Sequence, residues 1–197
     1  MINEVKNYRD EKDNIISYSG SALHKVSVIF TGSNNKLHID SATKITDAVF
    51  RFDCDNGICN VGNNSFSGYV RIGHGCKVEI GNGVTCTGKC YISTAEESGV
   101  VVGKDCMIAT SVEIRSDDAH PIFDVMTEKR VNFSKDIIIG DHVWIGAKVT
   151  LLSGSEIGNG SVIGLGSIVK SKFPNNVVAV GSPAQIVKRI LLGSAHI

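Results

Sequence analysis

Aliphatic residues recur every six positions along residues 139–169, which read IGDHVWIGAKVTLLSGSEIGNGSVIGLGSIV. The first position of each six-residue unit, or hexad, is Ile139, Ile145, Leu151, Ile157, Ile163 or Val169. A period of six is neither the 3.6 of an amphipathic helix nor the 2 of an alternating strand. It fits a chain that turns after each short strand, with the aliphatic residue inward and glycine or asparagine at the corner. The period therefore predicts an all-β fold, the parallel β-helix.

The same pattern recurs upstream with less regularity, in hexads that start at Ile39, Ile45, Val61, Ile72, Ile80, Cys86, Val102, Ile108 and Ile114. We interpret the slips between these blocks as bulged corners or small insertions. Three hexads would close one coil of 18 residues, and stacked coils would share one aliphatic core. The pattern predicts an N-terminal segment over 1–36, a β-helix over 37–172 and a C-terminal extension over 173–197.

One long break separates the hexads at Ile114 and Ile139. The segment between them contains RSDDAHPIFDVMTEKRVNFSKD and has no six-residue frame. Long segments without secondary structure in compact domains are usually functional. The break therefore predicts a loop over 115–136 that protrudes from the coil.

A short helix is expected after the coil. Ser182 is a suitable N-cap, and Pro183 suits the first helical position. The apolar residues that follow have helical spacing: Ile186, Val187, Ile190 and Leu191. Such a helix would cover the open end of the solenoid.

Charge, cysteines and hydropathy exclude several classes of protein. Lysine plus arginine equals aspartate plus glutamate at 20 each, which does not indicate a strongly basic nucleic-acid binder. The six cysteines form no CxxC pair and no zinc spacing with histidine, so we expect buried free thiols and no metal. The N-terminus lacks an apolar signal region, and no apolar run approaches the roughly 18 residues of a membrane span. These features predict a soluble cytoplasmic protein.

The motifs DDAHPIFD, RVN and VGSPAQIV, together with the hexads, closely resemble the hexapeptide-repeat acyltransferases. Within that family the pattern is similar to the sugar O-acetyltransferases, which include galactoside and maltose acetyltransferases and capsule or O-antigen enzymes of the polysialic acid type. The match is specific from about Asp117 to Val187 and rests on the repeat alone over 37–116. The resemblance implies a triangular prism with left-handed coils. It also implies a homotrimer with active sites between subunits and acetyl-CoA as co-substrate.

The resemblance makes His120, in the His-Pro motif, the general base on the protruding loop. Trp144 follows 24 positions later, the separation typical of the sugar acetyltransferases. A hydroxyl must lose its proton as it attacks a thioester, and a neutral imidazole is suited to accept it. Asp117, Asp118 and Asp124 are candidates to orient the ring, and the sequence does not choose among them. The alternative for His120 is an ordinary solvated loop histidine.

The resemblance also implies a binding site for acetyl-CoA on the coils. Trp144 would line the cleft, although a lone tryptophan is often a core or interface anchor. Backbone groups after it would hold the acetyl and pantetheine parts, and basic residues would meet the phosphates. These residues are Ala147, Gly164, Leu165, Gly166, Ser167, Lys170 and Lys172. The glycines equally suit coil corners, and the lysines equally suit a solvated surface.

The predicted function is acetyl-CoA-dependent O-acetylation of a sugar hydroxyl, in capsule or O-antigen polysaccharide modification. The alternative is N-acetylation of a nucleotide-linked amino sugar or of a xenobiotic. The acceptor stays open, because the N-terminus does not resemble the helical segment of the galactoside enzymes. A γ-class carbonic anhydrase needs two histidines five residues apart, and His120 has no such partner over 121–125. A purely structural solenoid is a further alternative, and the pairing of His120 with Trp144 argues against it.

Overall fold

The computed structural model describes residues 1–21 and 23–189, and these form three sheets around one core. The nine-stranded sheet contains β1 (Tyr8–Arg9), β2 (Ile15–Ser17), β4 (Lys36–Ile39), β6 (Ile58–Val61), β8 (Lys77–Ile80), β11 (Gly99–Val102), β14 (Ile137–Ile139), β17 (Glu156–Ile157) and β20 (Lys172–Phe173). The seven-stranded sheet contains β3 (His24–Phe30), β5 (Thr46–Phe52), β7 (Gly68–Ile72), β10 (Cys90–Thr94), β13 (Val112–Arg115), β16 (Thr150–Leu151) and β19 (Ile168–Val169). The six-stranded sheet contains β9 (Thr85–Cys86), β12 (Met107–Ile108), β15 (Trp144–Ile145), β18 (Val162–Ile163), β21 (Val177–Gly181) and β22 (Ala184–Arg189).

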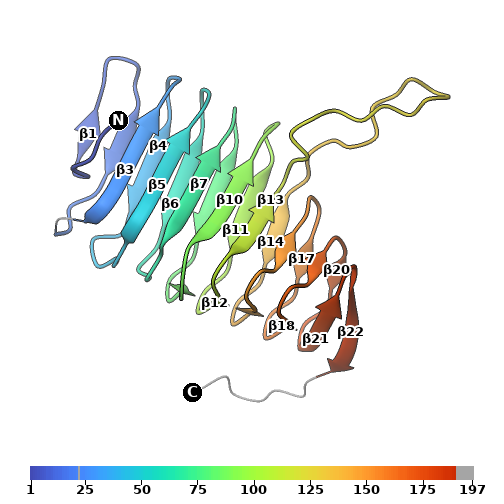
Figure 1. Cartoon of the computed structure of the whole chain (residues 1–197). Helices are drawn as coiled ribbons and strands as arrows, with labels where there is room; N and C mark the ends of the chain where they lie inside the picture. Colours follow the sequence, from blue (N-terminus) through green and yellow to red (C-terminus); the bar gives the residue numbers. More distant parts are fainter. Residues whose placement is uncertain (22, 190–197) are drawn as a thin grey trace.

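Successive strands along the chain pass from one sheet to the next, and from β7 onward each coil contributes one strand to each face of a prism (Figure 1). The coils before β9 contribute strands to only two of the three sheets. Neighbouring coils pair in parallel, for example β14 with β17 and β15 with β18. The predicted parallel β-helix is therefore confirmed.

The core follows the hexads. All six first positions between Ile139 and Val169 are buried, and so are the fifth positions, which include Val143, Val149 and three serines. The inward serines satisfy their hydroxyl groups within the coil, as when Ser167 Oγ donates to Gly164 O at 2.7 Å. A buried hydroxyl that keeps a hydrogen bond avoids most of its desolvation cost.

Coil length differs between the two halves of the chain. Ile138 lies opposite Glu156, 18 residues later, as three hexads require. Cys90 lies opposite Val112, 22 residues later. The N-terminal coils are longer because their strands and corners carry additional residues, and this accounts for the slips of the hexad frame.

The coil also begins before the first hexads. Strand β2 pairs in parallel with β4, and β3 pairs in parallel with β5. Residues before position 37 therefore supply strands to two of the three sheets. These strands follow the two-residue alternation of burial without glycine at every corner, so a six-residue period does not reveal them.

The predicted C-terminal helix is wrong for the described residues. Ala184–Arg189 form β22, which pairs antiparallel with β21, and Ser182 and Pro183 lie in the turn between them. Strand β22 provides hydrogen-bond partners for the edge of β21, which would otherwise leave backbone groups unpaired. Ile190 and Leu191 lie outside the described residues. No helix among residues 1–21 and 23–189 is long and apolar enough to cross a membrane.

An arm leaves the prism where the hexads break. Strand β13 ends at Arg115, β14 begins at Ile137, and the chain between them reaches away from the coils (Figure 1). The arm folds back on itself: Val131 N donates to Ile122 O and Asp124 N donates to Lys129 O, both at 2.9 Å, around an antiparallel bridge between Phe123 and Arg130. The arm starts at the prism corner between the seven-stranded and nine-stranded sheets.

Candidate active site

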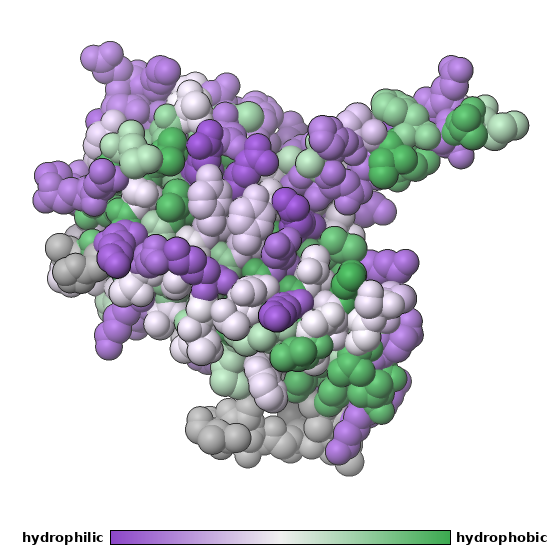
Figure 2. All heavy atoms as spheres, in the orientation of Figure 1, coloured by the Kyte–Doolittle hydropathy of each residue, from purple (hydrophilic) through white to green (hydrophobic). Residues whose placement is uncertain are grey.

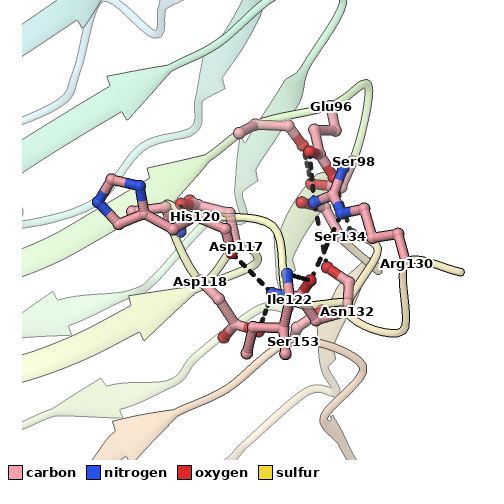
Figure 3. A network of polar contacts seen from close by, with 12 residues as sticks. Glu96, Ser98, Asp117, Asp118, His120, Ile122, Arg130, Asn132, Ser134 and Ser153 are labelled. Atoms are coloured by element: carbon pink, nitrogen blue, oxygen red, sulfur yellow. Dashed lines mark hydrogen bonds and ion pairs between the residues drawn. The ribbon is translucent and has the colours of Figure 1, made fainter. Parts of the chain in front are cut away.

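One asparagine side chain bonds the backbone at and just after His120 and the side chain of Asp118 (Figure 3). Asn132 Nδ2 donates to His120 O at 2.9 Å and to Asp118 Oδ2 at 3.0 Å. Asn132 Oδ1 accepts a hydrogen bond from Ile122 N at 2.6 Å. A primary amide can donate twice and accept at its oxygen, and Asn132 uses both functions here. Asn132 therefore ties together three points of residues 118–122 at the base of the arm.

A second contact ties the arm to the coil. Arg130 forms an ion pair with Glu96 at 2.6 Å, and Ser134 N donates to the other oxygen of Glu96 at 3.1 Å. The hydrogen bond from Ser134 and the pairing with Arg130 lower the pKa of Glu96. The guanidinium of Arg130 also lies 4.8 Å from the ring centroid of Phe133. Glu96 thus anchors the returning strand of the arm in its ionised form.

The imidazole of His120 is exposed and turns away from these contacts (Figure 3). Of the three aspartates predicted as candidates to orient the ring, Asp117 and Asp118 precede His120 by three and two residues. Asp117 accepts hydrogen bonds from Ser93 Oγ at 3.1 Å and from Ala119 N at 2.9 Å. Within the described part of the chain, no aspartate bonds the imidazole.

Asp124 lies further along the arm and serves its turn. Its carboxylate accepts hydrogen bonds from Met126 N at 3.0 Å and Thr127 N at 2.7 Å. These bonds from Thr127 and Met126 lower the pKa of Asp124. Asp124 therefore bonds within the turn of the arm, whereas Asp117 and Asp118 lie at the base of the arm near His120.

A groove of about 460 Å³ runs along the base of the arm. One wall comes from the coils and includes Asp53, Arg71 and His74, and the other includes Ala119 and Pro121 on either side of His120. Sequence reasoning missed the coil wall, because these residues have no motif. Only the strand register brings them next to the arm.

Trp144 lies at a different corner of the prism. It opens β15 in the six-stranded sheet, between Met107 and Val162 of the neighbouring coils, and is half exposed. His142 occupies the preceding corner with a φ of 55°, and its Nδ1 lies 3.9 Å from Asp105 Oδ2. Within one chain, His120 and Trp144 are therefore carried by different corners.

The predicted backbone groups for acetyl-CoA lie on two stacked corners after Trp144. Ala147 O accepts a hydrogen bond from Gly166 N at 2.8 Å, and Ser167 is buried beneath. Gly164 precedes Leu165, which is 75% exposed at the tip of its corner. Gly166 has a φ of +69°, a conformation that suits glycine, and space around it is open.

The two predicted lysines differ in their surroundings. Lys172 in β20 forms an ion pair with Glu156 of the preceding coil, whereas Lys170 is exposed at a corner. The charge of Lys172 is therefore already balanced by a neighbouring carboxylate.

The remaining reactive groups are cysteines. All six are free thiols: Cys59, Cys76, Cys90 and Cys106 are buried, Cys86 is half-buried and Cys54 is exposed. Burial raises the pKa of Cys106 to about 11. In residues 1–21 and 23–189, no group of three or more histidine, cysteine, aspartate or glutamate side chains is placed to hold a metal ion.

Comparison with known proteins gives matches over most of the chain. A family model for bacterial transferase hexapeptide repeats (six repeats) matches residues 136–171. A polysialic acid O-acetyltransferase of Escherichia coli O1:K1 / APEC is 40% identical over 130 residues, which are 66% of this chain but only 42% of that relative. A polysialic acid O-acetyltransferase of Neisseria meningitidis is 36% identical over 145 residues, which are 72% of this chain and 67% of the relative. The crystal structure of the polySia-specific acetyltransferase NeuO superposes with a TM-score of 0.79 at 33% identity, over 93% of this chain and 91% of NeuO.

Proposed function

The chain belongs to the hexapeptide-repeat family of acyltransferases, and we propose that it transfers an acetyl group from acetyl-CoA to a sugar hydroxyl. Its relatives named for polysialic acid support a role in modifying a capsule or O-antigen polysaccharide. The reaction would take place in the cytoplasm, where acetyl-CoA is available.

The observation that carries the proposal is the placement of His120. Asn132 bonds its carbonyl at the base of the arm, and its neighbours Ala119 and Pro121 line the groove. In the proposed reaction, the neutral imidazole removes the proton from a sugar hydroxyl as the oxygen attacks the thioester carbonyl. The tetrahedral intermediate then collapses, the C–S bond breaks, and the CoA thiolate leaves and is protonated. A general base in this role typically contributes about 10²- to 10⁴-fold to the rate.

We propose that Asp117 or Asp118 orients the ring in the assembled site. Both residues precede His120 in the chain, by three and two positions, and both line the groove. Catalytic hydrogen bonds are often incomplete without substrate and form in the bound complex.

The donor site would be built by the coils after β15. Trp144 and the corners at Ala147 and 164–167 offer an exposed ring and free backbone surface for the pantetheine arm. Lys170 is the better partner for the CoA phosphates, because Lys172 already pairs with Glu156.

The proposed assembly is a homotrimer with each site between two subunits. His120 and Trp144 occupy different corners of one prism, so a neighbouring prism can bring the base of one chain to the tryptophan of another. The arm supports this assembly, because its apolar side chains are exposed: Ile122, Phe123, Val125, Met126, Val131 and Phe133. Exposed apolar clusters of this kind mark surfaces that contact another protein.

The test is an acetyl-transfer assay with the purified chain. Acetyl-CoA would be supplied with a sialic acid oligomer, a galactoside or a nucleotide-linked amino sugar, and thiol release and product mass would be followed. We expect a mass gain of one or more acetyl groups on a sugar, reduced about 10²-fold or more in His120→Ala. The variant should keep its melting temperature and its affinity for acetyl-CoA. Equal turnover of the variant and the wild type would exclude His120 as the base.

A further inference from the structure

The groove at the base of the arm is richer in carboxylates than in cations. The acidic residues that line it, on the coils and on the arm, are Asp53, Glu96, Asp117 and Asp118. The arginines that line it are Arg71 and Arg130. Figure 2 shows hydrophilic side chains where the arm meets the coils, whereas hydrophobic ones gather along the arm. A molecule that lies in this groove beside His120 therefore meets more negative than positive charge.

Both arginines of the groove are already paired within the chain. Arg71 Nε donates to one oxygen of Asp53, and Arg51, which lies beside the groove, donates to the other. The hydrogen bond to Asp53 raises the pKa of Arg71, as it does when a guanidinium is held by carboxylates. Arg130 pairs with Glu96 at 2.6 Å. Each arginine that lines the groove is therefore matched by a carboxylate of the protein itself.

The carboxylates of Asp117 and Asp118 have no such match. Among residues 1–21 and 23–189, neither forms an ion pair. Asp117 accepts hydrogen bonds from Ser93 Oγ and Ala119 N, and Asp118 accepts one from Asn132 Nδ2. A carboxylate can accept about four hydrogen bonds, so both residues keep free acceptor sites. Those sites are enough to orient His120 and to bind a further donor.

Free carboxylate oxygens suit hydroxyl groups, because a hydroxyl donates the hydrogen bond that the oxygen accepts. An acceptor that carried its own carboxylate would instead face Asp117 and Asp118 with the same sign of charge. Repulsion between like charges is stronger in a partly enclosed groove than in bulk water, because the effective dielectric constant is lower there. The charges of the groove therefore favour a hydroxyl-rich molecule that is not an acid.

We propose that the sugar residue acetylated by this chain is uncharged, and that the groove selects it through hydrogen bonds from its hydroxyls to Asp117 and Asp118. The inference rests on the proposed function, since it places the acceptor beside the same histidine. It sets this chain apart from the relatives named polysialic acid O-acetyltransferases, because polysialic acid carries a carboxylate on every sugar residue. The groove of about 460 Å³ has the size of a small-molecule site and so holds a short part of a polysaccharide.

Binding measurements without acetyl-CoA test the inference separately from catalysis. The probes are a sialic acid oligomer, the same oligomer after reduction of its carboxylates to alcohols, and a galactose oligomer of equal length. We expect calorimetry to show roughly tenfold tighter binding of at least one neutral probe than of the acidic one. Added salt should strengthen binding of the acidic oligomer, because it screens repulsion, and should leave the neutral probes unchanged.

Charge-removing variants locate the selectivity in the groove. Asp117→Asn and Asp118→Asn each keep an acceptor oxygen for a hydroxyl but remove one negative charge. Each should narrow the difference between the acidic and the reduced oligomer by about threefold or more. Asp47→Asn is the matched control, because it removes the same charge at the opposite end of β5, where Asp47 pairs with Lys89. It should keep the wild-type difference, and all three variants should keep the wild-type melting temperature within a few degrees.

Several results would overturn the inference. They are equal or tighter binding of the acidic oligomer, binding of that oligomer that weakens as salt is added, or no binding of either neutral probe. Folded Asp117→Asn and Asp118→Asn variants that both keep the wild-type difference would also overturn it. Acetyl transfer to the sialic acid oligomer alone would contradict the inference and support the proposed function. Selective binding of a neutral probe without acetyl transfer to any sugar would contradict the proposed function and leave the selectivity of the groove standing.

Discussion

Asn132 is the residue on which the geometry around His120 depends most directly. Its amide bonds the carbonyl of the histidine and the N–H of Ile122, and no other side chain among the described residues bonds both groups. Among residues 1–21 and 23–189, no aspartate accepts a hydrogen bond from the imidazole. Its position therefore depends on the backbone beneath it.

We predict that Asn132→Ala lowers kcat about tenfold, which corresponds to roughly 1.4 kcal/mol in activation free energy. The loss should come from a less ordered base of the arm, so hydrogen exchange over 118–122 should become faster while the melting temperature stays within a few degrees. Asp124→Ala is the matched control, because Asp124 bonds only within the turn of the arm. Its kcat should stay within twofold of the wild type. Unchanged exchange and turnover in Asn132→Ala would contradict this role.

Residues with a motif could be predicted from the sequence, and residues defined by contact could not. His120 and Trp144 stand out because a histidine-proline pair interrupts the hexads and a tryptophan lies within one. Asn132 and Arg71 have no such signature. Asn132 acts through the return of a loop, and Arg71 reaches the groove through the parallel pairing of β7 with β5 and β10. The roles of the predicted site residues stay predictions until the assays are made.

At the scale of the element, each coil is held by the inward aliphatic residue at its corner. Leu151 is fully buried at the first position of its hexad, in β16. Leu165 is 75% exposed at the corner that follows β18. The two leucines differ in burial but not in chemistry. They form a matched pair for measuring how much the stacked corners stabilise the fold.

We predict that Leu151→Ala lowers the free energy of unfolding by about 2–5 kcal/mol, because it removes buried methyl groups and leaves a cavity. Leu165→Ala should change it by less than about 0.5 kcal/mol. Chemical denaturation followed by circular dichroism measures both. Similar losses in the two variants would mean that the hexad position does not determine burial.

The elements also show where pattern reasoning has limits. The six-residue period found the regular coils, but the first coil before residue 37 has strands without hexads. At the other end, helical spacing of apolar residues suggested a helix, and the chain instead forms β22. The free edge of β21 decides this outcome, because a strand there completes backbone hydrogen bonds that a helix would leave unpaired.

At the scale of the whole molecule, a single prism separates the two residues with the strongest sequence signals. The arm with His120 leaves the corner between the seven-stranded and nine-stranded sheets, and Trp144 begins its strand in the six-stranded sheet. The arm is also apolar at its tip, where Val125 and Met126 are almost fully exposed. Both features are expected of a subunit that completes its site with a neighbour.

Mixed oligomers test whether one site uses His120 of one subunit and Trp144 of the next. His120→Ala and Trp144→Ala should each be nearly inactive alone. When the two are co-expressed in equal amounts and assemble at random, about a quarter of the sites should pair an intact His120 with an intact Trp144. Activity should therefore rise to about a quarter of the wild-type value. A mixture no more active than its parents would place both residues in the same subunit's site.

The double variant with His120→Ala and Trp144→Ala, mixed equally with wild type, is the matched control. A site shared between subunits needs two wild-type neighbours, so about a quarter of the wild-type activity should remain. A site within one subunit would retain about half, because each wild-type chain would act alone. Tagging the two chains differently and purifying through both tags confirms that mixed oligomers have formed. The two mixtures together distinguish a shared site from a self-contained one without reference to the identity of the acceptor.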